Sequence, residues 1–339
     1  MTQVTPRASE PLGDEASLAS GDLKVRNGRR SRLAQAVNAS MVALALVLLV
    51  VFFAITSSHF ITADNVQTIF DDVAVVAVLT IGQQLVITTA GIDLSLGPNA
   101  ALSGMIAGLM MPHGMWVGVL LAVLLGTGVG LLNGFIVAFT RIPPFIVTLG
   151  TNGICDGGAL LATSGVGIYT FPKTFLSFGT GSWGVFPFLI IVTIILAILG
   201  QLLLSMTRFG RSVYAIGSNF RAAHLSGLPV RRNLILVYTI AGFLAGVAGL
   251  LLTAYVAGAI PTAGDSYVLP PIAAVVIGGG SLFGGEGTVW GAMLGALLMS
   301  VLSDGTQLLG VSTYTEEVIL GVVVIGAVFI DSFRKRVAV

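Results

Sequence analysis

The chain has little charge for its length. Only 9% of its 339 residues are Asp, Glu, Lys or Arg, whereas a soluble globular domain contains about 25%. Sixteen basic and 15 acidic side chains are too few to cover the surface of a water-soluble protein of this size. The apolar fraction of 55% and the mean hydropathy of +0.98 also exclude intrinsic disorder. The composition therefore predicts an all-α protein, a polytopic transmembrane helical bundle.

Side chains that carry catalytic or metal chemistry are also scarce. The single cysteine, Cys155, excludes an intramolecular disulfide, and His59, His113 and His224 share no metal-ligand spacing. No lysine lies in a G-x-x-x-x-G-K-[ST] phosphate loop, and neither an H-E-x-x-H pair nor a G-x-S-x-G elbow occurs. We predict no enzyme activity, and no metal or cofactor bound by this chain. The net charge of +1 gives no sign of a nucleic-acid partner, and we predict none.

Long apolar runs follow a polar stretch of about 37 residues. A helix needs about 20 mostly apolar residues to cross about 30 Å of hydrocarbon, and several runs fit that length. The runs at 270–281 and 288–303 are short, which predicts broken or tilted segments there. The sequence predicts about ten spans, at 40–58, 73–90, 95–111, 115–139, 145–163, 187–205, 233–257, 270–281, 288–303 and 316–331.

The distribution of basic residues tests this count through the positive-inside rule. With a cytoplasmic N-terminus and ten crossings, 15 of the 16 basic residues fall on the cytoplasmic side and only Lys173 falls outside. Asp71 and Asp72 fall outside by the same count. We therefore predict that both termini are cytoplasmic. The predicted organisation is a polar cytoplasmic tail at 1–37, a transmembrane domain at 38–332 with a cytoplasmic loop at 206–232, and a cytoplasmic tail at 333–339.

Glycines recur at a spacing of four within three of the spans. This spacing places them on one helix face, where the missing side chains let helices approach closely. Close packing inside one bundle is the plainer interpretation, and a dimer contact or a moving interface is the alternative. The residues concerned are Gly126, Gly130 and Gly134, then Gly242 and Gly246, then Gly287, Gly291 and Gly295.

The cytoplasmic loop contains a candidate short helix. Ser218 or Asn219 can cap it, residues 220–226 can form about two turns, and Gly227 followed by Pro229 ends it. So short a helix is unstable alone in water and needs a surface to lie against. It is either a turn packed on the membrane or on its own chain, or a docking helix that transmits force from a cytoplasmic partner.

The same loop resembles the signature T-x-F-G-R…Y-A-I-G-x-N…A-A…S-G-[IL]-x-V of the ribose/xylose/arabinose-type permeases of ABC transporters. These permeases are the inner-membrane component of binding-protein-dependent transport systems. Further matching blocks occur in the family's order and spacing from about residue 60 to the end. They are GIDLSLG at 91–97, NG at 133–134, IPPFIVTLGT at 142–151, AAVVIGGGSLFGGEGT at 273–288 and VILGVVVIGAVFID at 318–331.

This resemblance implies the membrane-spanning permease subunit of an ABC importer in the bacterial inner membrane. The implied substrate is a monosaccharide or a similar small polyhydroxylated solute. The implied partners are a second permease subunit (the same chain or a close paralogue), a cytoplasmic ABC ATPase that binds ATP and Mg, a periplasmic sugar-binding protein, and membrane lipid. The resemblance assigns coupling with the ATPase to Ser218, Asn219, Phe220, Arg221, Ala222, Ala223, His224 and Leu225.

Polar residues inside the spans are candidates for the wall of a transport pathway. A neutral sugar needs hydrogen-bond donors and acceptors rather than a charge pair. Each such residue can instead cross-link two helices, and both interpretations stay open at this point. The predicted pathway residues are Ser95, Asn99, Asn133, Thr148, Thr151, Asn152 and Asp156.

Asp156 departs from the family pattern. Relatives commonly continue L-G-T-M-x-I-x-R-G, and this chain has LGTNGICDGG, so Asp156 stands at the usual Arg position. The alternative to a pathway role is a bond from Asp156 to a neighbouring helix, for example at Asn133 or Asn152. A carboxylate at membrane depth is costly and is common in ion-coupled carriers. A stand-alone or ion-coupled secondary carrier for a small polar solute is therefore the alternative function.

Overall fold

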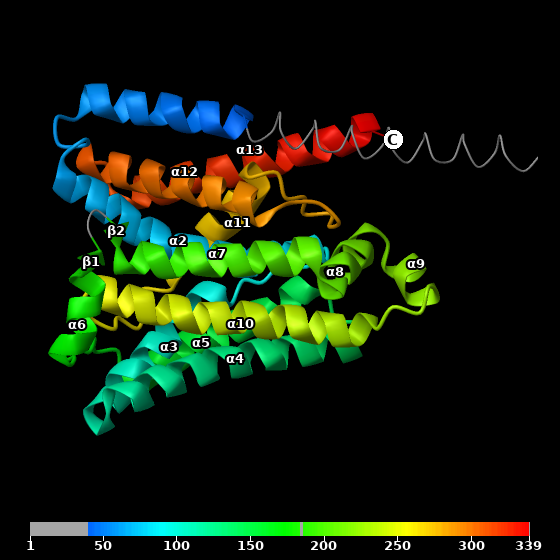
Figure 1. The fold of residues 1–339 in the computed structure, drawn as a ribbon, viewed down its shortest axis with the longest axis horizontal. Helices are drawn as coiled ribbons and strands as arrows, with labels where there is room; N and C mark the ends of the chain where they lie inside the picture. Colours follow the sequence, from blue (N-terminus) through cyan, green and yellow to red (C-terminus); the bar gives the residue numbers. More distant parts are fainter. Residues whose placement is uncertain (1–39, 184–185, 339) are drawn as a thin grey trace, which may run out of the picture.

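The computed structural model describes residues 40–183 and 186–338, and this part of the chain is mostly helical (Figure 1). Each of the ten apolar runs coincides with a helix. These helices are Ser40–Thr56, α2 (Ala63–Thr88), α3 (Leu96–Met110), α4 (Met115–Phe139), α5 (Pro144–Thr163), α7 (Phe188–Met206), α10 (Val230–Tyr255), α11 (Leu269–Ile277), α12 (Val289–Leu308) and α13 (Thr313–Ala338).

The helices differ in their ability to cross a membrane. Of the described helices, six have the length and composition needed to cross a membrane: α2, α4, α5, α7, α10 and α12. Two further apolar helices, Ser40–Thr56 and Asp265–Ile277, are shorter. The break expected near 270–281 is present, because α11 ends at Ile277 and the chain forms a loop before α12. The chain is thus a helical bundle suited to a membrane, and the count of ten crossings stays a prediction.

Several short elements connect the long helices. Figure 1 places α6 with the hairpin β1–β2 at one end of the bundle and α8 with α9 at the other. The end of α13 lies toward the end that carries α8 and α9 (Figure 1). The short elements are η1 (Met111–His113), α6 (Lys173–Thr180), β1 (Ser182–Trp183), β2 (Phe186–Pro187), α8 (Arg208–Ser218), α9 (Phe220–Leu225) and η2 (Asp265–Tyr267).

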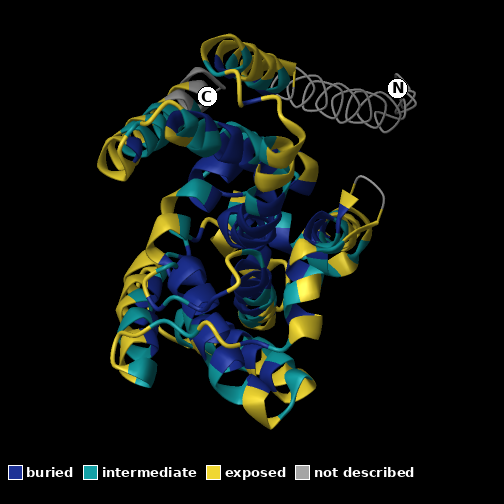
Figure 2. Cartoon of the chain, turned by 90° about the vertical axis from the view of Figure 1, so that its left-hand side faces the viewer, coloured by how far each residue is buried: buried dark blue, intermediate teal, exposed yellow. Residues whose placement is uncertain are grey.

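Helix α2 forms the centre of the bundle. Every residue from Val73 to Thr88 is buried, and this stretch is mostly apolar on all sides, as expected of a helix enclosed by others. Outer helices instead carry exposed residues beside buried ones, as the mixed colours of Figure 2 show, and many of the exposed side chains are large and apolar. On α13 the exposed side chains of Val318, Val322 and Ile325 recur at helical spacing. Such a stripe suits contact with lipid tails.

The glycine face of α4 packs against α10 within the same chain. A Cβ added at Gly130 would lie 2.2 Å from the carbonyl oxygen of Tyr238 and 2.8 Å from Cα of Gly242. Gly126 is equally close to Gly246. Close packing inside one bundle is therefore confirmed for these glycines. Gly287, however, lies in the loop before α12, with φ of +120°, so its assignment to a span was wrong.

One predicted boundary needs correction. Helix α2 begins at Ala63 and not near residue 73, because Thr62 accepts a hydrogen bond from Asn65 N at 3.4 Å and caps the helix early. Asp71 and Asp72 therefore lie inside α2. The segment predicted as a cytoplasmic tail at 333–339 is helical as far as Ala338, where α13 ends, and its cytoplasmic location stays a prediction. Basic residues near a helix C-terminus are favoured by the helix dipole. The tail predicted at 1–37 lies outside the described residues.

Candidate transport and docking sites

The segment between α2 and α3, residues 89–95, is non-helical backbone deep in the bundle. Ala90 takes a left-handed conformation, with φ of 62°, and Asp93 is 2% exposed. One carboxylate oxygen of Asp93 accepts hydrogen bonds from the backbone N–H and the hydroxyl of Ser95, at 2.8 and 2.6 Å. This local turn, in which an Asp side chain bonds two residues ahead, positions the start of α3.

A chain of buried hydrogen bonds connects this segment to α4 and α5. Asn133 on α4 donates to the Ser95 hydroxyl at 2.9 Å. Thr151 on α5 donates to the side-chain carbonyl of Asn133 at 2.6 Å. Ser95, Asn133 and Thr151 are each at most 5% exposed. Because both functional groups of the Asn133 side chain are satisfied by neighbouring helices, Asn133 fixes the relative position of three elements.

Helix α5 also binds the backbone of the same segment. Thr148 donates to the carbonyl of Ile92 at 3.1 Å, and Asn152 donates to the carbonyl of Leu94 at 3.0 Å. These bonds satisfy carbonyl groups that a broken helix leaves free inside a membrane. Asn99 on α3 similarly donates to the carbonyl of Gly126, at 3.2 Å.

Six of the seven predicted pathway residues therefore act as helix cross-links in this structure. The contacts favour the packing alternative for them, and a pathway role stays a prediction. Asp156 differs. Within the described part of the chain, its side chain makes no hydrogen bond to Asn133, to Asn152 or to any other residue. The bond proposed for Asp156 to a neighbouring helix is thus absent among the described residues.

The predicted short helix is present as α9, at the end of the bundle. Asn219 caps it by accepting a hydrogen bond from the N–H of Ala222 at 2.9 Å, and Gly227, with φ of +76°, follows it. Ala223 is buried against the bundle, whereas the side chains of Phe220 and Leu225 are 58% and 78% exposed. Aromatic side chains such as that of Phe220 are enriched in protein interfaces, so the exposed face of α9 is a candidate contact for a partner protein.

Ser218 takes a different place from the one predicted. It is the last residue of α8, and its hydroxyl bonds the carbonyl of Tyr214. The sequence analysis missed α8, which is amphipathic and buries Gly210, Val213 and Ile216. Exposed residues of α9 that were assigned to coupling are Phe220, Arg221, Ala222, His224 and Leu225.

Helix α8 joins α9 to the centre of the bundle. A Cβ at Gly217 would lie 1.9 Å from the carbonyl oxygen of Thr88, at the end of α2. The same carbonyl accepts a hydrogen bond from the N–H of Gly285, at 2.9 Å, in the loop before α12. Tyr214 donates to the carbonyl of Gly287 in that loop at 2.7 Å. Helix α8, which directly precedes α9, thus contacts both α2 and the loop before α12.

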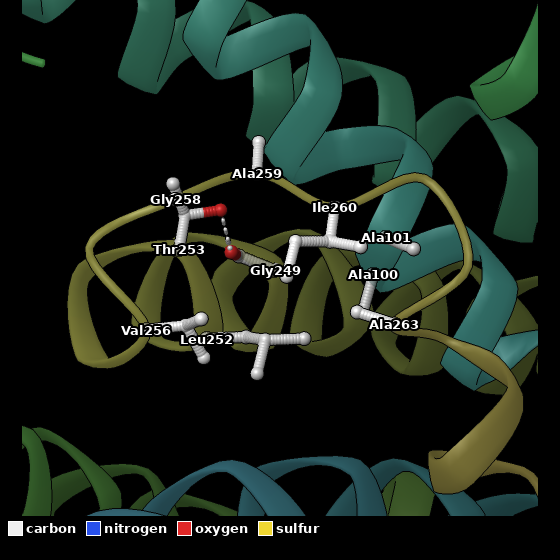
Figure 3. Close-up of a pocket in the computed structure, with 10 residues that line it drawn as sticks. All are labelled: Ala100, Ala101, Gly249, Leu252, Thr253, Val256, Gly258, Ala259, Ile260 and Ala263. Atoms are coloured by element: carbon white, nitrogen blue, oxygen red, sulfur yellow. Dashed lines mark hydrogen bonds between the residues drawn. The ribbon is translucent and has the colours of Figure 1, made fainter. Parts of the chain in front are cut away.

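Two neighbouring cavities lie near the C-terminal end of α10, away from α9. Figure 3 shows the smaller one, where the loop after α10 crosses α3. Its volume is about 10 Å³ and its wall is mainly apolar, so it holds at most one water molecule. The larger one, of about 690 Å³, shares Leu252, Val256 and Ala263 with it as a common wall. Only the larger cavity has room for a small organic solute.

Comparison with known proteins gives consistent matches along most of the chain. Residues 65–328 match the family described as branched-chain amino acid transport system, permease component. The chain is 38% identical to the ribose import permease protein RbsC of Escherichia coli over 86% of this chain and 93% of the relative. It is 34% identical to the D-allose transport system permease protein AlsC of Escherichia coli, over 86% and 90%. It is 36% identical to the fructose import permease protein FrcC of Rhizobium meliloti, over 86% and 84%.

Proposed function

The chain belongs to the family of branched-chain amino acid transport system permease components, and from that premise we propose that it carries a monosaccharide. It is a multi-pass permease subunit of an ABC transporter, and so a transport component rather than an enzyme. The observation that carries the substrate class is that relatives covering most of this chain are named for ribose, allose and fructose. These three sugars are small, neutral and polyhydroxylated.

The proposed orientation places α8, α9 and both termini in the cytoplasm. Arg208, Arg211 and Arg221 lie on α8 and α9. Arg231 lies beside them at the start of α10, with its guanidinium carbon 5.2 Å from the ring centroid of Phe139 at the end of α4. The positive-inside rule assigns this basic end to the cytoplasm. Lys173, at the start of α6, lies at the opposite end, which is then periplasmic.

Members of this family work with ATPase and binding-protein partners. We propose that α9 is the surface on which the ATPase acts, that ATP and Mg bind to that partner, and that two permease subunits pair in the membrane. The bonds from α8 to α2 and to the loop before α12 support this role for α9. They give a rigid route by which force on α9 reaches the most buried helix of the bundle.

Affinity purification of the tagged chain from its own membranes tests the proposal. The expected result is a stoichiometric cytoplasmic ATPase bound to the permease. A periplasmic protein from the same system should bind a monosaccharide and stimulate uptake in liposomes. A chain that transports sugar in liposomes with no ATPase present would instead support the stand-alone carrier, and the unpaired Asp156 would be the first residue to test.

The docking role of α9 gives a second prediction. Replacing both Phe220 and Leu225 by Ser removes two exposed apolar side chains that contribute about 1.5 kcal/mol or more each when buried by a partner. We expect retention of the ATPase to weaken by about a hundredfold, while the permease itself stays folded. Val166→Ser, an exposed apolar residue at the opposite end, is the matched control. Normal retention of the ATPase and normal uptake in the double variant would remove the docking role.

A further inference from the structure

The larger cavity lies at the end of the bundle opposite α9. Five parts of the chain enclose it: α2, the end of α10, the segment through η2 to the start of α11, α12, and the start of α13. Its volume of about 690 Å³ is within the range of about 300–1,000 Å³ found for small-molecule sites. In the proposed orientation the cavity is on the periplasmic side, where a delivered solute would enter.

The polar part of the cavity wall includes four carboxyl groups among hydroxyl and amide side chains. Asp72, Asp265, Glu316 and Glu317 contribute to it, and no basic side chain is among its described residues. One oxygen of Asp72 accepts a hydrogen bond from the Tyr267 hydroxyl at 3.2 Å. The Ser300 hydroxyl also lies beside this carboxyl group. A ligand that binds to the carboxyl groups of the wall supplies hydrogen-bond donors.

A second observation points to a missing ligand. Ser300 on α12 is 1% exposed and lines the cavity. Its hydroxyl lies beside the Asp72 carboxyl group, but it makes no hydrogen bond of normal geometry within the described structure. A buried polar group without a partner costs about 1–3 kcal/mol, so a bound water, ion or ligand is expected beside it. The Ser300 hydroxyl can both donate to and accept from a hydroxyl group of a bound solute.

Hydrogen bonds fix the position of the Glu316 side chain in the same wall. One of its oxygens accepts a hydrogen bond from the Ser303 hydroxyl, which in turn accepts one from the side-chain amide of Gln307 at 3.1 Å. The remaining oxygen of Glu316 makes no hydrogen bond in the described chain. Opposite these groups, Val76, Leu252 and Met299 give the cavity an apolar side.

We propose that this cavity is a transit site for a monosaccharide inside each permease subunit. The inference rests on the proposed function and names a binding site for its substrate. Carboxylate oxygens and the Ser300 hydroxyl bond the sugar hydroxyls, and the apolar side packs against the C–H face of the ring. A metal ion fits less well, because the described residues contain no group of three or more ligands that could hold one. The cavity is also far larger than an ion requires.

Cysteine protection tests the site directly. The only native cysteine, Cys155, is buried, so Cys155→Ser gives a background for Gln307→Cys, which is exposed in the cavity wall. We would label the purified transporter with N-ethylmaleimide, which is uncharged, with D-ribose, D-allose or D-fructose present. A sugar at three times its dissociation constant should slow labelling about fourfold. Ser177→Cys, exposed on α6 at the same end, should show no protection.

Sodium chloride at equal osmolality separates a sugar site from a cation site. Protection by a sugar and not by the salt supports the proposal. Equal protection by the salt overturns it in favour of a cation site. No protection at Gln307→Cys by any solute, in a protein that still transports one of these sugars, also overturns it.

Transport by variants gives an independent measurement. Ser300→Ala together with Glu316→Gln should lower uptake at sub-saturating sugar by about tenfold, because hydrogen bonds to the sugar are lost. The control is Asp64→Asn, an exposed carboxylate at the same end but outside the cavity. Unchanged uptake in the double variant contradicts the transit site alone. Absence of sugar uptake in the unsubstituted transporter contradicts the proposed function itself, so the two failures are distinguishable.

Discussion

Gly130→Val is expected to destabilise the bundle strongly. The first side-chain carbon at this position would lie 2.2 Å from the carbonyl oxygen of Tyr238, and 2.8 and 2.9 Å from Cα and N of Gly242. All three are backbone atoms of α10, so relief requires α4 and α10 to separate along their whole contact. Overpacking of a core costs about 1–3 kcal/mol even where side chains can yield. We expect a loss of about 3 kcal/mol or more in the free energy of unfolding.

The same substitution two residues earlier is the control. Gly128 is also in α4, but it is exposed and a Cβ there meets nothing within 4 Å. Gly128→Val should therefore give a normal yield and a normal melting temperature in detergent. Fluorescence-detected size-exclusion chromatography after heating measures the yield and the melting temperature of both variants. Equal stability of the two proteins would mean that the α4–α10 contact is looser than the structure indicates.

This pair shows what local sequence can and cannot predict. A spacing of four identifies the face on which Gly126, Gly130 and Gly134 lie, because helix periodicity is a local property. It does not identify α10 as the helix that covers this face, since that partner is more than 90 residues away in sequence. Gly128 and Gly130 are both glycines of α4, and only the face of the helix on which each lies distinguishes them.

Polar residues inside the spans show the same limit. Hydropathy identifies Asn133 and Thr151 as unusual for a membrane interior, so the sequence analysis could select them. Their partners lie on three different elements, and sequence spacing does not distinguish a cross-link from a pathway wall. The cavity residues Asp72, Ser300 and Glu316 were missed for a related reason. They come from α2, α12 and α13, and Asp72 had been assigned to a loop outside the membrane.

A local capping signal was more informative than hydropathy at α9. Asn219, followed by a short helix and Gly227, predicted α9 correctly because an N-cap and a left-handed C-terminal glycine act within one turn. The cap at Thr62 was not used in the sequence analysis, and the start of α2 was therefore missed.

Asp93→Ala is the second substitution with a large expected effect. It removes the acceptor of the backbone N–H and hydroxyl of Ser95 and leaves the N–H donor buried without a partner. Each lost bond to a carboxylate is worth about 1.5–3 kcal/mol. The start of α3 would lose its fixed position, and with it the hydrogen bond from Asn133 to Ser95. We expect a fall of about 3 kcal/mol in the free energy of unfolding and a loss of sugar uptake.

Asp93→Asn separates the geometry of this turn from its charge. The side-chain oxygen of Asn can accept both hydrogen bonds from Ser95, and the second oxygen of Asp93 has no hydrogen-bond partner among the described residues. If Asp93 acts as a structural acceptor, Asp93→Asn should keep most of the stability and uptake that Asp93→Ala loses. Melting temperature in detergent and uptake in liposomes measure the two consequences separately. If Asp93→Asn is as stable as the unsubstituted protein but does not transport, the charge of Asp93 takes part in transport and the structural account is incomplete.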